Sequence, residues 1–333
     1  MLNRIWLSSF SFFLLFFHGC VGQTRPVKLK YTATGKIPKI LAVYEAWFGE
    51  PNHISVGYSS QDPQKVKQQI KAAKKEGIYA FVVDWYGDRD LYIDKNYAQM
   101  QQLAARQHFH IAMMYDQADR QVGATDEVIS DLQQFHDNYL AKNAPGSSAY
   151  LTYEGRPVIF IFPHGHFADW DEVRAAVNKW NPAPLLIDEN LPGKYAQDFD
   201  GFYPWINPGP KGWSPDGSHW GNHYLASFYK TMTRKYPDKI IVDGAWSQFD
   251  DSKAAWSLNR HISARCGQTF RDTLNYWKRY VPQKQVIPFI LIETWNDYEE
   301  GSDIEPGIPA CNGLAPITSI RKAAKKAPPQ IQQ

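Results

Sequence analysis

The sequence of 333 residues lacks several features that mark common protein classes. The formal net charge is only +2 and the basic residues are scattered, so there is no electrostatic footprint for a nucleic acid. There is no internal repeat, no low-complexity tract, no glycine-rich phosphate loop and no serine or cysteine nucleophile signature. These absences count against a nucleic-acid-binding protein, a repeat protein and a P-loop enzyme.

Long apolar runs and cysteines are also few. Arg4 precedes the apolar run from Ile5 to Phe17, which is too short for a comfortable transmembrane helix but is typical of a signal peptide. Of the three cysteines, Cys20 directly follows a small residue and resembles the lipidated cysteine of a bacterial lipobox, although Phe17 stands where leucine is usual. An ordinary cleaved signal is the alternative. Cys266 and Cys311 would be able to form a disulfide in an oxidising compartment, but the sequence does not show whether they meet.

These features predict an exported protein. We expect residues 1–19 to be a signal peptide of the lipoprotein type, with Cys20 lipidated, and residues 20–37 to be a linker. The protein is then an outer-membrane or cell-surface lipoprotein, or otherwise periplasmic or secreted. The lipid anchor would be its contact with the membrane.

Strand-like and helix-like patterns alternate along the rest of the chain. Asp62 and Pro63 predict a helix start and Gly77 its end, and apolar residues recur at helical spacing after the later strands as well. Continuous apolar strands separated by amphipathic helices indicate a parallel sheet covered by helices. The eight expected strands are Lys39 to Phe48, Ala80 to Tyr86, His110 to Tyr115, Pro157 to Phe162, Leu185 to Asp188, Gly201 to Ile206, Ile240 to Ala245 and Val286 to Thr294.

Eight such strands in a chain of this length favour an α/β fold of the (β/α)₈ TIM-barrel type. We expect a single barrel domain over residues 38–322 and a flexible tail over residues 323–333. The segment from Asn207 to Asn222, rich in glycine, proline and tryptophan, is expected to be a long functional loop after the sixth strand.

The carboxyl ends of the expected strands carry acids, histidines and aromatic residues. In barrels of this type these ends form the active-site face, and aromatic rings offer the flat apolar surfaces on which sugars stack. Asp188 and Glu189 end the fifth strand, and Asp250 and Asp251 follow the seventh. The candidate substrate-binding residues are Glu45, Trp47, Asp84, Trp85, Asp116, His164, His166, Tyr203, Trp205, Trp246, Trp295 and Asn296.

Two carboxylates just after the eighth strand are the candidate catalytic pair. Asp297 and Glu300 are three residues apart, so a helical turn would point both in the same direction. Glycoside hydrolysis needs one protonated and one ionised carboxyl group, and burial with mutual repulsion pushes their pKa values apart. Glu299, between them, is expected to point elsewhere and to be solvated or structural.

The segment from Thr294 to Pro306 (TWNDYEEGSDIEP) resembles the last-strand motif of glycoside hydrolase families 71 and 99. Family 99 comprises endo-α-mannosidases and endo-α-mannanases, and family 71 comprises fungal α-1,3-glucanases. Asp297 and Glu300 fall on the two catalytic carboxylates of both families. Residues 44–49 (YEAWFG) and 77–87 (GIYAFVVDWYG) resemble the first two strands of family 99. Asp250-Asp251, Asn259-Arg260 and Gly267 resemble the region before its last helix.

The resemblance implies an endo-acting glycoside hydrolase that cleaves α-linked mannan-like or glucan-like chains. Asp297 stands where family 99 has glutamate, and Glu299 where family 71 has glycine. The shorter Asp297 leaves more room for a water molecule, which favours inversion of the anomeric centre. The expected partner is an oligosaccharide or polysaccharide, with no cofactor, no metal and a monomeric state.

Other interpretations remain open at this point. A non-catalytic glycan-binding lipoprotein would need the aromatic residues but not both acids. A polysaccharide-biosynthesis protein can carry a similar motif, although the export signal counts against it. His164 and His166, or the oxygen-rich cluster of Asp88, Asp90, Asp94 and Asn96, would be able to bind a metal, but partner ligands are not evident.

Overall fold

The computed structural model describes residues 38–117, 123–163, 167–208, 218–282, 285, 287–315, 320 and 324–326. The expected signal peptide, Cys20, the linker and most of the expected tail lie outside this part of the chain. Within it, no helix is long and apolar enough to cross a membrane.

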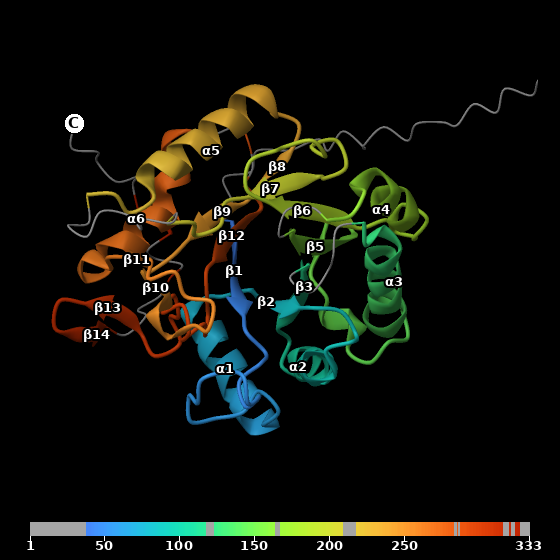
Figure 1. Cartoon of the computed structure of the whole chain (residues 1–333), viewed down its shortest axis with the longest axis horizontal. Helices are drawn as coiled ribbons and strands as arrows, with labels where there is room; N and C mark the ends of the chain where they lie inside the picture. Colours follow the sequence, from blue (N-terminus) through green and yellow to red (C-terminus); the bar gives the residue numbers. More distant parts are fainter. Residues whose placement is uncertain are drawn as a thin grey trace, which may run out of the picture.

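Parallel strands form a closed ring at the centre of the molecule (Figure 1). The strands are β1 (Lys39–Tyr44), β2 (Ala80–Trp85), β3 (His110–Asp116), β5 (Arg156–Phe162), β6 (Leu185–Glu189), β7 (Gly201–Tyr203), β8 (Ile240–Ile241), β9 (Asp243–Ala245) and β12 (Phe289–Ile292). Their order is β8-β7-β6-β5-β3-β2-β1-β12-β9.

The two ends of this sheet belong to one run of chain. β8 pairs with β7 and β9 pairs with β12, and only Val242 separates β8 from β9. The amide of Val242 donates to the carbonyl oxygen of Phe202 at 3.0 Å, which continues the pairing between the halves. β8 and β9 are therefore the two halves of the seventh barrel strand, and the predicted single-domain (β/α)₈ barrel is confirmed.

Helices surround the ring on its outside (Figure 1). They are α1 (Pro63–Glu76), α2 (Leu91–Arg106), α3 (Thr125–Phe135), α4 (Trp170–Val177), α5 (Asn222–Lys235) and α6 (Gln268–Tyr276). The predicted limits of α1 are confirmed: the carboxylate of Asp62 accepts from the amide of Gln64, and Gly77 ends the helix with a φ of 93°. Residues 190–200, which connect β6 to β7, form turns rather than a helix, because Pro192 and Gly193 interrupt them.

Three strands are shorter than the apolar runs from which they were predicted. The first ends at Tyr44 rather than Phe48, and the eighth begins at Phe289 rather than Val286. The sixth ends at Tyr203, because Pro204 has no amide hydrogen to continue the ladder. The amide of Ile206 instead donates to the buried carboxylate of Glu293. Apolar character alone did not distinguish strand from the buried loops that follow.

Smaller elements decorate the barrel. The two-residue strand β4 (Thr152–Tyr153) pairs with β5, and two hairpins pair β10 (Phe249–Asp250) with β11 (His261–Ile262) and β13 (Ile308–Ala310) with β14 (Gly313–Ala315). The short helices are η1 (His136–Leu140), η2 (Ser147–Ala149), η3 (Asp251–Lys253), η4 (Arg265–Gly267) and η5 (Trp277–Arg279). A disulfide joins Cys266 to Cys311 and so ties the β13–β14 hairpin to the start of α6.

Candidate functional site

A cavity of about 540 Å³ opens at the carboxyl ends of the barrel strands. This is the face on which (β/α)₈ enzymes carry their active sites. Both candidate catalytic residues, Asp297 and Glu300, line it. The other lining residues are Glu45, Trp47, Asp84, Tyr86, Asp116, Phe162, Glu189, Trp205, Ile206, Asn207, Phe249, Trp256 and Arg260.

A tight turn after β12 brings the two carboxylates together. The Oδ1 atom of Asp297 accepts hydrogen bonds from the amides of Glu299 at 3.0 Å and Glu300 at 2.9 Å. The amide of Asp297 itself donates to the hydroxyl of Thr294 at 2.8 Å. These hydrogen bonds within residues 294–300 fix the turn and, with it, the positions of Asp297 and Glu300.

Glu300 is held at its carboxylate as well as at its backbone. The indole Nε1 of Trp256 donates to Oε1 of Glu300 at 2.9 Å. The carbonyl oxygen of Glu300 accepts from the amide of Asp250 at 2.7 Å, which joins the turn to β10. Trp256 is 43% exposed although it is a large apolar residue, so its ring is available to a ligand at the mouth of the cavity.

Burial and neighbouring charges raise the pKa values of both members of the pair. Burial raises the pKa of Asp297 well above its ordinary value, and the charge of Glu300 adds to this effect. Burial also raises the pKa of Glu300, while the hydrogen bond from Trp256 and the charge of Arg260 oppose the rise. The pair therefore retains a proton at pH values at which isolated carboxylic acids have lost theirs.

Glu299 points away from the pair, and its role is structural. Its carboxylate is 1% exposed and accepts from Nδ1 of His53 at 2.8 Å and from the amide of Ile54 at 3.1 Å. The His53 ring stacks on Trp47 at 4.7 Å between ring centroids. Trp47 in turn meets Trp256 edge to face at 6.2 Å. Glu299 thus supports the aromatic wall beside the cavity.

The loop that carries Trp256 is organised by one buried carboxylate. Asp251 is fully buried and accepts from the hydroxyl of Ser257, from the amides of Leu258 and Arg260, and from Nε of Arg260 at 2.7 Å. These four bonds close residues 251–260 into a compact loop over the cavity. The position of Trp256, and through it the bond to Glu300, follows from this network.

Five of the twelve predicted substrate-binding residues line the cavity, namely Glu45, Trp47, Asp84, Asp116 and Trp205. Five others do not, namely Trp85, Tyr203, Trp246, Trp295 and Asn296. His164 and His166 lie outside the described residues.

The five residues away from the cavity have internal partners. Successive side chains of a strand point to opposite faces, so Asp84 reaches the cavity while Trp85 packs outward on Phe135 and donates to Asp94. The other four are also buried and have internal partners. The Tyr203 hydroxyl donates to the carbonyl oxygen of Ile161, and the Trp246 indole donates to that of Trp220. Trp295 packs on Phe81, and the Asn296 side chain forms two hydrogen bonds with the backbone of Glu45.

Several cavity residues were not among the predicted candidates. Glu189 stood out as a strand-end acid, and Arg260 belongs to a stretch that resembles family 99, but neither was assigned to the site. Trp256 had no signal of its own beyond its place between Asp251 and Arg260. Tyr86 donates its hydroxyl to Asp84 at 2.8 Å and so orients that carboxylate.

The described residues contain no group of three or more histidines, cysteines or acids placed to hold a metal ion. Three residues of the oxygen-rich cluster after β2 have structural roles. Asp90 caps α2, Asp94 accepts from Trp85 and Tyr139, and Asn96 donates to the carbonyl oxygen of Ala46.

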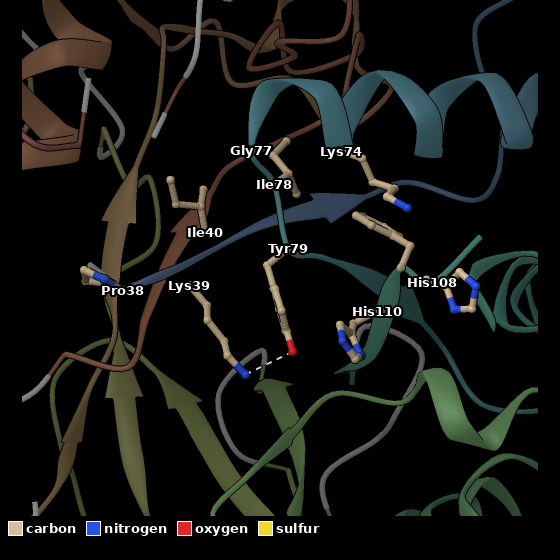
Figure 2. A pocket seen from close by; sticks show the side chains of 10 residues that line it. Pro38, Lys39, Ile40, Lys74, Gly77, Ile78, Tyr79, His108 and His110 are labelled. Carbon is tan, nitrogen blue, oxygen red and sulfur yellow. Dashed lines mark hydrogen bonds between the residues drawn. The ribbon is translucent and has the colours of Figure 1, made fainter. Parts of the chain in front are cut away.

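A second, smaller cavity of about 250 Å³ lies at the amino ends of the first strands, where Figure 2 shows Lys39, Tyr79 and His110. Lys39 donates to the hydroxyl of Tyr79 at 3.1 Å, as the dashed line in Figure 2 marks. This end of a (β/α)₈ barrel contributes to stability rather than to catalysis. The acidic cavity at the opposite end is therefore the candidate active site.

The fold and the site together define a (β/α)₈ barrel with a carboxylate-rich cavity on its catalytic face. The chain is similar to two structures of the GH99 endo-α-mannosidase of Bacteroides thetaiotaomicron, each with a TM-score of 0.62. The identities are 19% and 18%, over 86% of this chain and 99% and 98% of those chains. A structure described as a glycoside hydrolase-like protein has a TM-score of 0.64 at 16% identity, over 88% of this chain and 95% of that one. No family model and no curated protein matches the chain.

Proposed function

We propose that the protein is a glycoside hydrolase that cleaves α-linked glycans with Asp297 and Glu300 as its carboxylate pair. The observation that carries this proposal is the position of both side chains in the wall of one cavity at the carboxyl ends of the strands. The similarity to endo-α-mannosidase structures supports it at the level of the fold.

In the proposed reaction, protonated Glu300 donates its proton to the glycosidic oxygen as the bond to the anomeric carbon breaks. Ionised Asp297 accepts a proton from a water molecule that attacks the anomeric carbon from the opposite face. Trp256 holds the carboxyl group of Glu300 in place through its indole hydrogen bond. Burial raises the pKa values of both carboxyl groups, so the pair holds a shared proton near neutral pH that Glu300 delivers to the leaving oxygen.

The substrate that we propose is an α-linked polysaccharide of the mannan or glucan type, cleaved at internal linkages. The cavity lining supports a saccharide ligand, because Trp47, Trp205 and Trp256 lie beside carboxylates that accept from hydroxyl groups. Phe162 packs edge to face on Trp205 at 5.1 Å and extends the opposite wall.

A screen of the purified protein against α-mannans and α-glucans tests this proposal, with released reducing ends as the measurement. We expect turnover of at least one α-linked polysaccharide, and loss of about 10² to 10⁴-fold in Asp297→Asn and Glu300→Gln. Glu172→Gln, which removes an exposed acid of α4, is the matched control. Unchanged turnover in either catalytic variant, with folding intact, would remove the assignment.

We also propose that the protein is exported and lipidated at Cys20. The signal-like run from Ile5 to Phe17 supports export, and the disulfide between Cys266 and Cys311 is of the kind that persists in oxidising compartments. The test is detergent phase partitioning of the full chain expressed in a bacterium with a lipoprotein pathway. Wild type should enter the detergent phase and Cys20→Ala the aqueous phase. Equal partitioning of both would exclude the anchor.

A further inference from the structure

The cavity carries more acid than the catalytic pair requires. Glu45, Asp84 and Asp116 follow or end β1, β2 and β3, which are neighbours in the ring, and β1 also neighbours β12, the strand before the catalytic turn. Their side chains therefore lie along one wall, adjacent to Asp297 and Glu300. Glu189, the last residue of β6, adds another carboxylate.

Little positive charge in the cavity offsets these acids. Arg260 is the one lysine or arginine among the described lining residues, and its guanidinium Nε is bonded to Asp251 at 2.7 Å. Neither Glu45 nor Asp84 forms an ion pair with another described residue. Glu45 and Asp84 thus have no cation to pair with in the part of the chain that the structure describes.

Two oxygen atoms of this wall also lack hydrogen-bond partners. Glu45 is 3% exposed and Asp84 is 7% exposed, and neither Oε2 of Glu45 nor Oδ1 of Asp84 has a partner within the described chain. Burying a carboxylate oxygen without a partner is costly, and such an atom in a ligand cavity indicates a group supplied by the ligand. The backbone of Glu45 is fixed by two hydrogen bonds with Asn296, so the strand end that carries the acid is itself rigid.

The pKa values of the wall carboxylates also bear on the kind of ligand. Burial raises the pKa of Glu45 well above its ordinary value, and the charges of Asp84, Asp297 and Glu300 raise it further. Burial and the charge of Asp116 do the same for Asp84. A neutral sugar hydroxyl can donate a single hydrogen bond to such a cluster. An ammonium group donates three and neutralises the repulsion between the acids.

We propose that the substrate of this cavity is a cationic α-linked glycan whose sugars carry free amino groups, and that Glu45 and Asp84 bind the ammonium group of one such sugar. This inference rests on the proposed glycoside hydrolase function and specifies its substrate class. The carboxylates of the β1–β3 wall recognise the charge of the sugar, while Asp297 and Glu300 act on its glycosidic bond.

A binding measurement tests the substrate class without relying on turnover. The probes are oligosaccharides of α-linked galactosamine with free amines and the same oligosaccharides after N-acetylation. Their binding to Glu300→Gln, which keeps the β1–β3 wall intact, is measured by calorimetry. We expect the free-amine form to bind about tenfold or more tightly than the acetylated form, because charge-assisted hydrogen bonds are lost on acetylation. Equal binding, or binding of neither form, overturns the proposal.

Variants assign the preference to the wall. In the Glu300→Gln background, Glu45→Gln and Asp84→Asn remove one charge each without changing side-chain size, and we expect each to abolish most of the preference. Glu172→Gln, which removes an exposed acid of α4, is the matched control for net charge and should leave the preference unchanged. If all three variants behave alike while remaining folded by thermal denaturation, the wall does not recognise the amine.

Turnover separates this inference from the proposed function. Hydrolysis of α-linked polygalactosamine at about tenfold or higher kcat/KM than of its N-acetylated form and of neutral α-mannan would support both. Hydrolysis of neutral α-glycans without preference for the amine overturns the substrate class and leaves the hydrolase. Amine-dependent binding with no hydrolysis of any glycan overturns the hydrolase and leaves the cationic ligand.

Discussion

Replacing Asp251 with alanine should destabilise the loop over the cavity and weaken the site at the same time. Asp251 is fully buried, and its carboxylate accepts from two backbone amides, one hydroxyl and the guanidinium of Arg260. Alanine leaves the two amides without their partner and the guanidinium without its counter-ion. Buried unsatisfied groups of this kind cost about 1 to 3 kcal/mol each, and a broken buried ion pair about 3 to 5 kcal/mol.

Because water can enter the loop after the substitution, we expect the low end of that range. The expected loss is about 3 kcal/mol in the free energy of unfolding, or about 5 to 10 °C in melting temperature for a domain of this size. Chemical and thermal denaturation measure it. Asp250→Ala is the control, because the neighbouring Asp250 is exposed and its side chain caps only the amide of Ser252. Its cost should be about 1 kcal/mol or less.

The effect of Asp251→Ala on stability should depend on pH. Burial opposes ionisation of Asp251, but the hydrogen bonds from Arg260 and from the loop amides outweigh it and hold the pKa below its ordinary value. The stability that the folded loop gains from ionised Asp251 is present above the unfolded pKa of about 4 and is lost as the pH falls through the lower folded pKa. The difference between wild type and Asp251→Ala should therefore shrink in acid. Equal stability of the Asp251 and Asp250 variants at neutral pH would refute the reasoning.

Three further predictions concern the disulfide, the aromatic wall and the catalytic pair. Replacing Cys266 and Cys311 together by serine should lower the free energy of unfolding in denaturant by about 2 to 5 kcal/mol, because the disulfide closes a long loop. A loss no greater than that caused by a serine substitution at an exposed position would contradict this. Trp256→Phe should lower kcat/KM about tenfold or more by removing the hydrogen bond to Glu300, while the free energy of unfolding stays near that of wild type. Unaltered kinetics would show that the indole does not hold the carboxyl group of Glu300. Burial raises the pKa values of Asp297 and Glu300. As the pH is lowered, activity should therefore fall when Asp297 is protonated, at a pH above the ordinary carboxyl range of about 4. A midpoint of the pH–activity profile at or below about 4 would contradict the raised values.

Most of the barrel was predictable because local signals agreed with the global fold. The apolar strands, the Asp62 cap and the Gly77 terminus are each fixed by a few neighbouring residues. The interruption of the seventh strand at Val242 depends on how the ring closes. Such features follow from contacts between distant segments, which apolar periodicity does not encode.

The candidate site was predictable only in part for a related reason. Asp84 and Trp85 are neighbours at the end of one strand, and the register of the sheet decides that the acid, not the indole, faces the cavity. Trp256 reaches Glu300 only because Asp251 bonds to Arg260 nine residues later in the chain. The pairing of Cys266 with Cys311 likewise joins positions 45 residues apart. The acidic turn itself was identifiable because its residues are adjacent in sequence.

The role of Glu300 as proton donor is tested most directly by varying the leaving group. The measurement compares Glu300→Gln with wild type on the natural glycan and on a 2,4-dinitrophenyl glycoside of the same sugar, whose leaving group needs no proton. The account predicts a loss of about 10² to 10⁴-fold on the glycan and a much smaller loss on the dinitrophenyl glycoside, whereas Asp297→Asn should lose activity on both. An equal loss of activity by Glu300→Gln on the two substrates, or no loss on either, would contradict it.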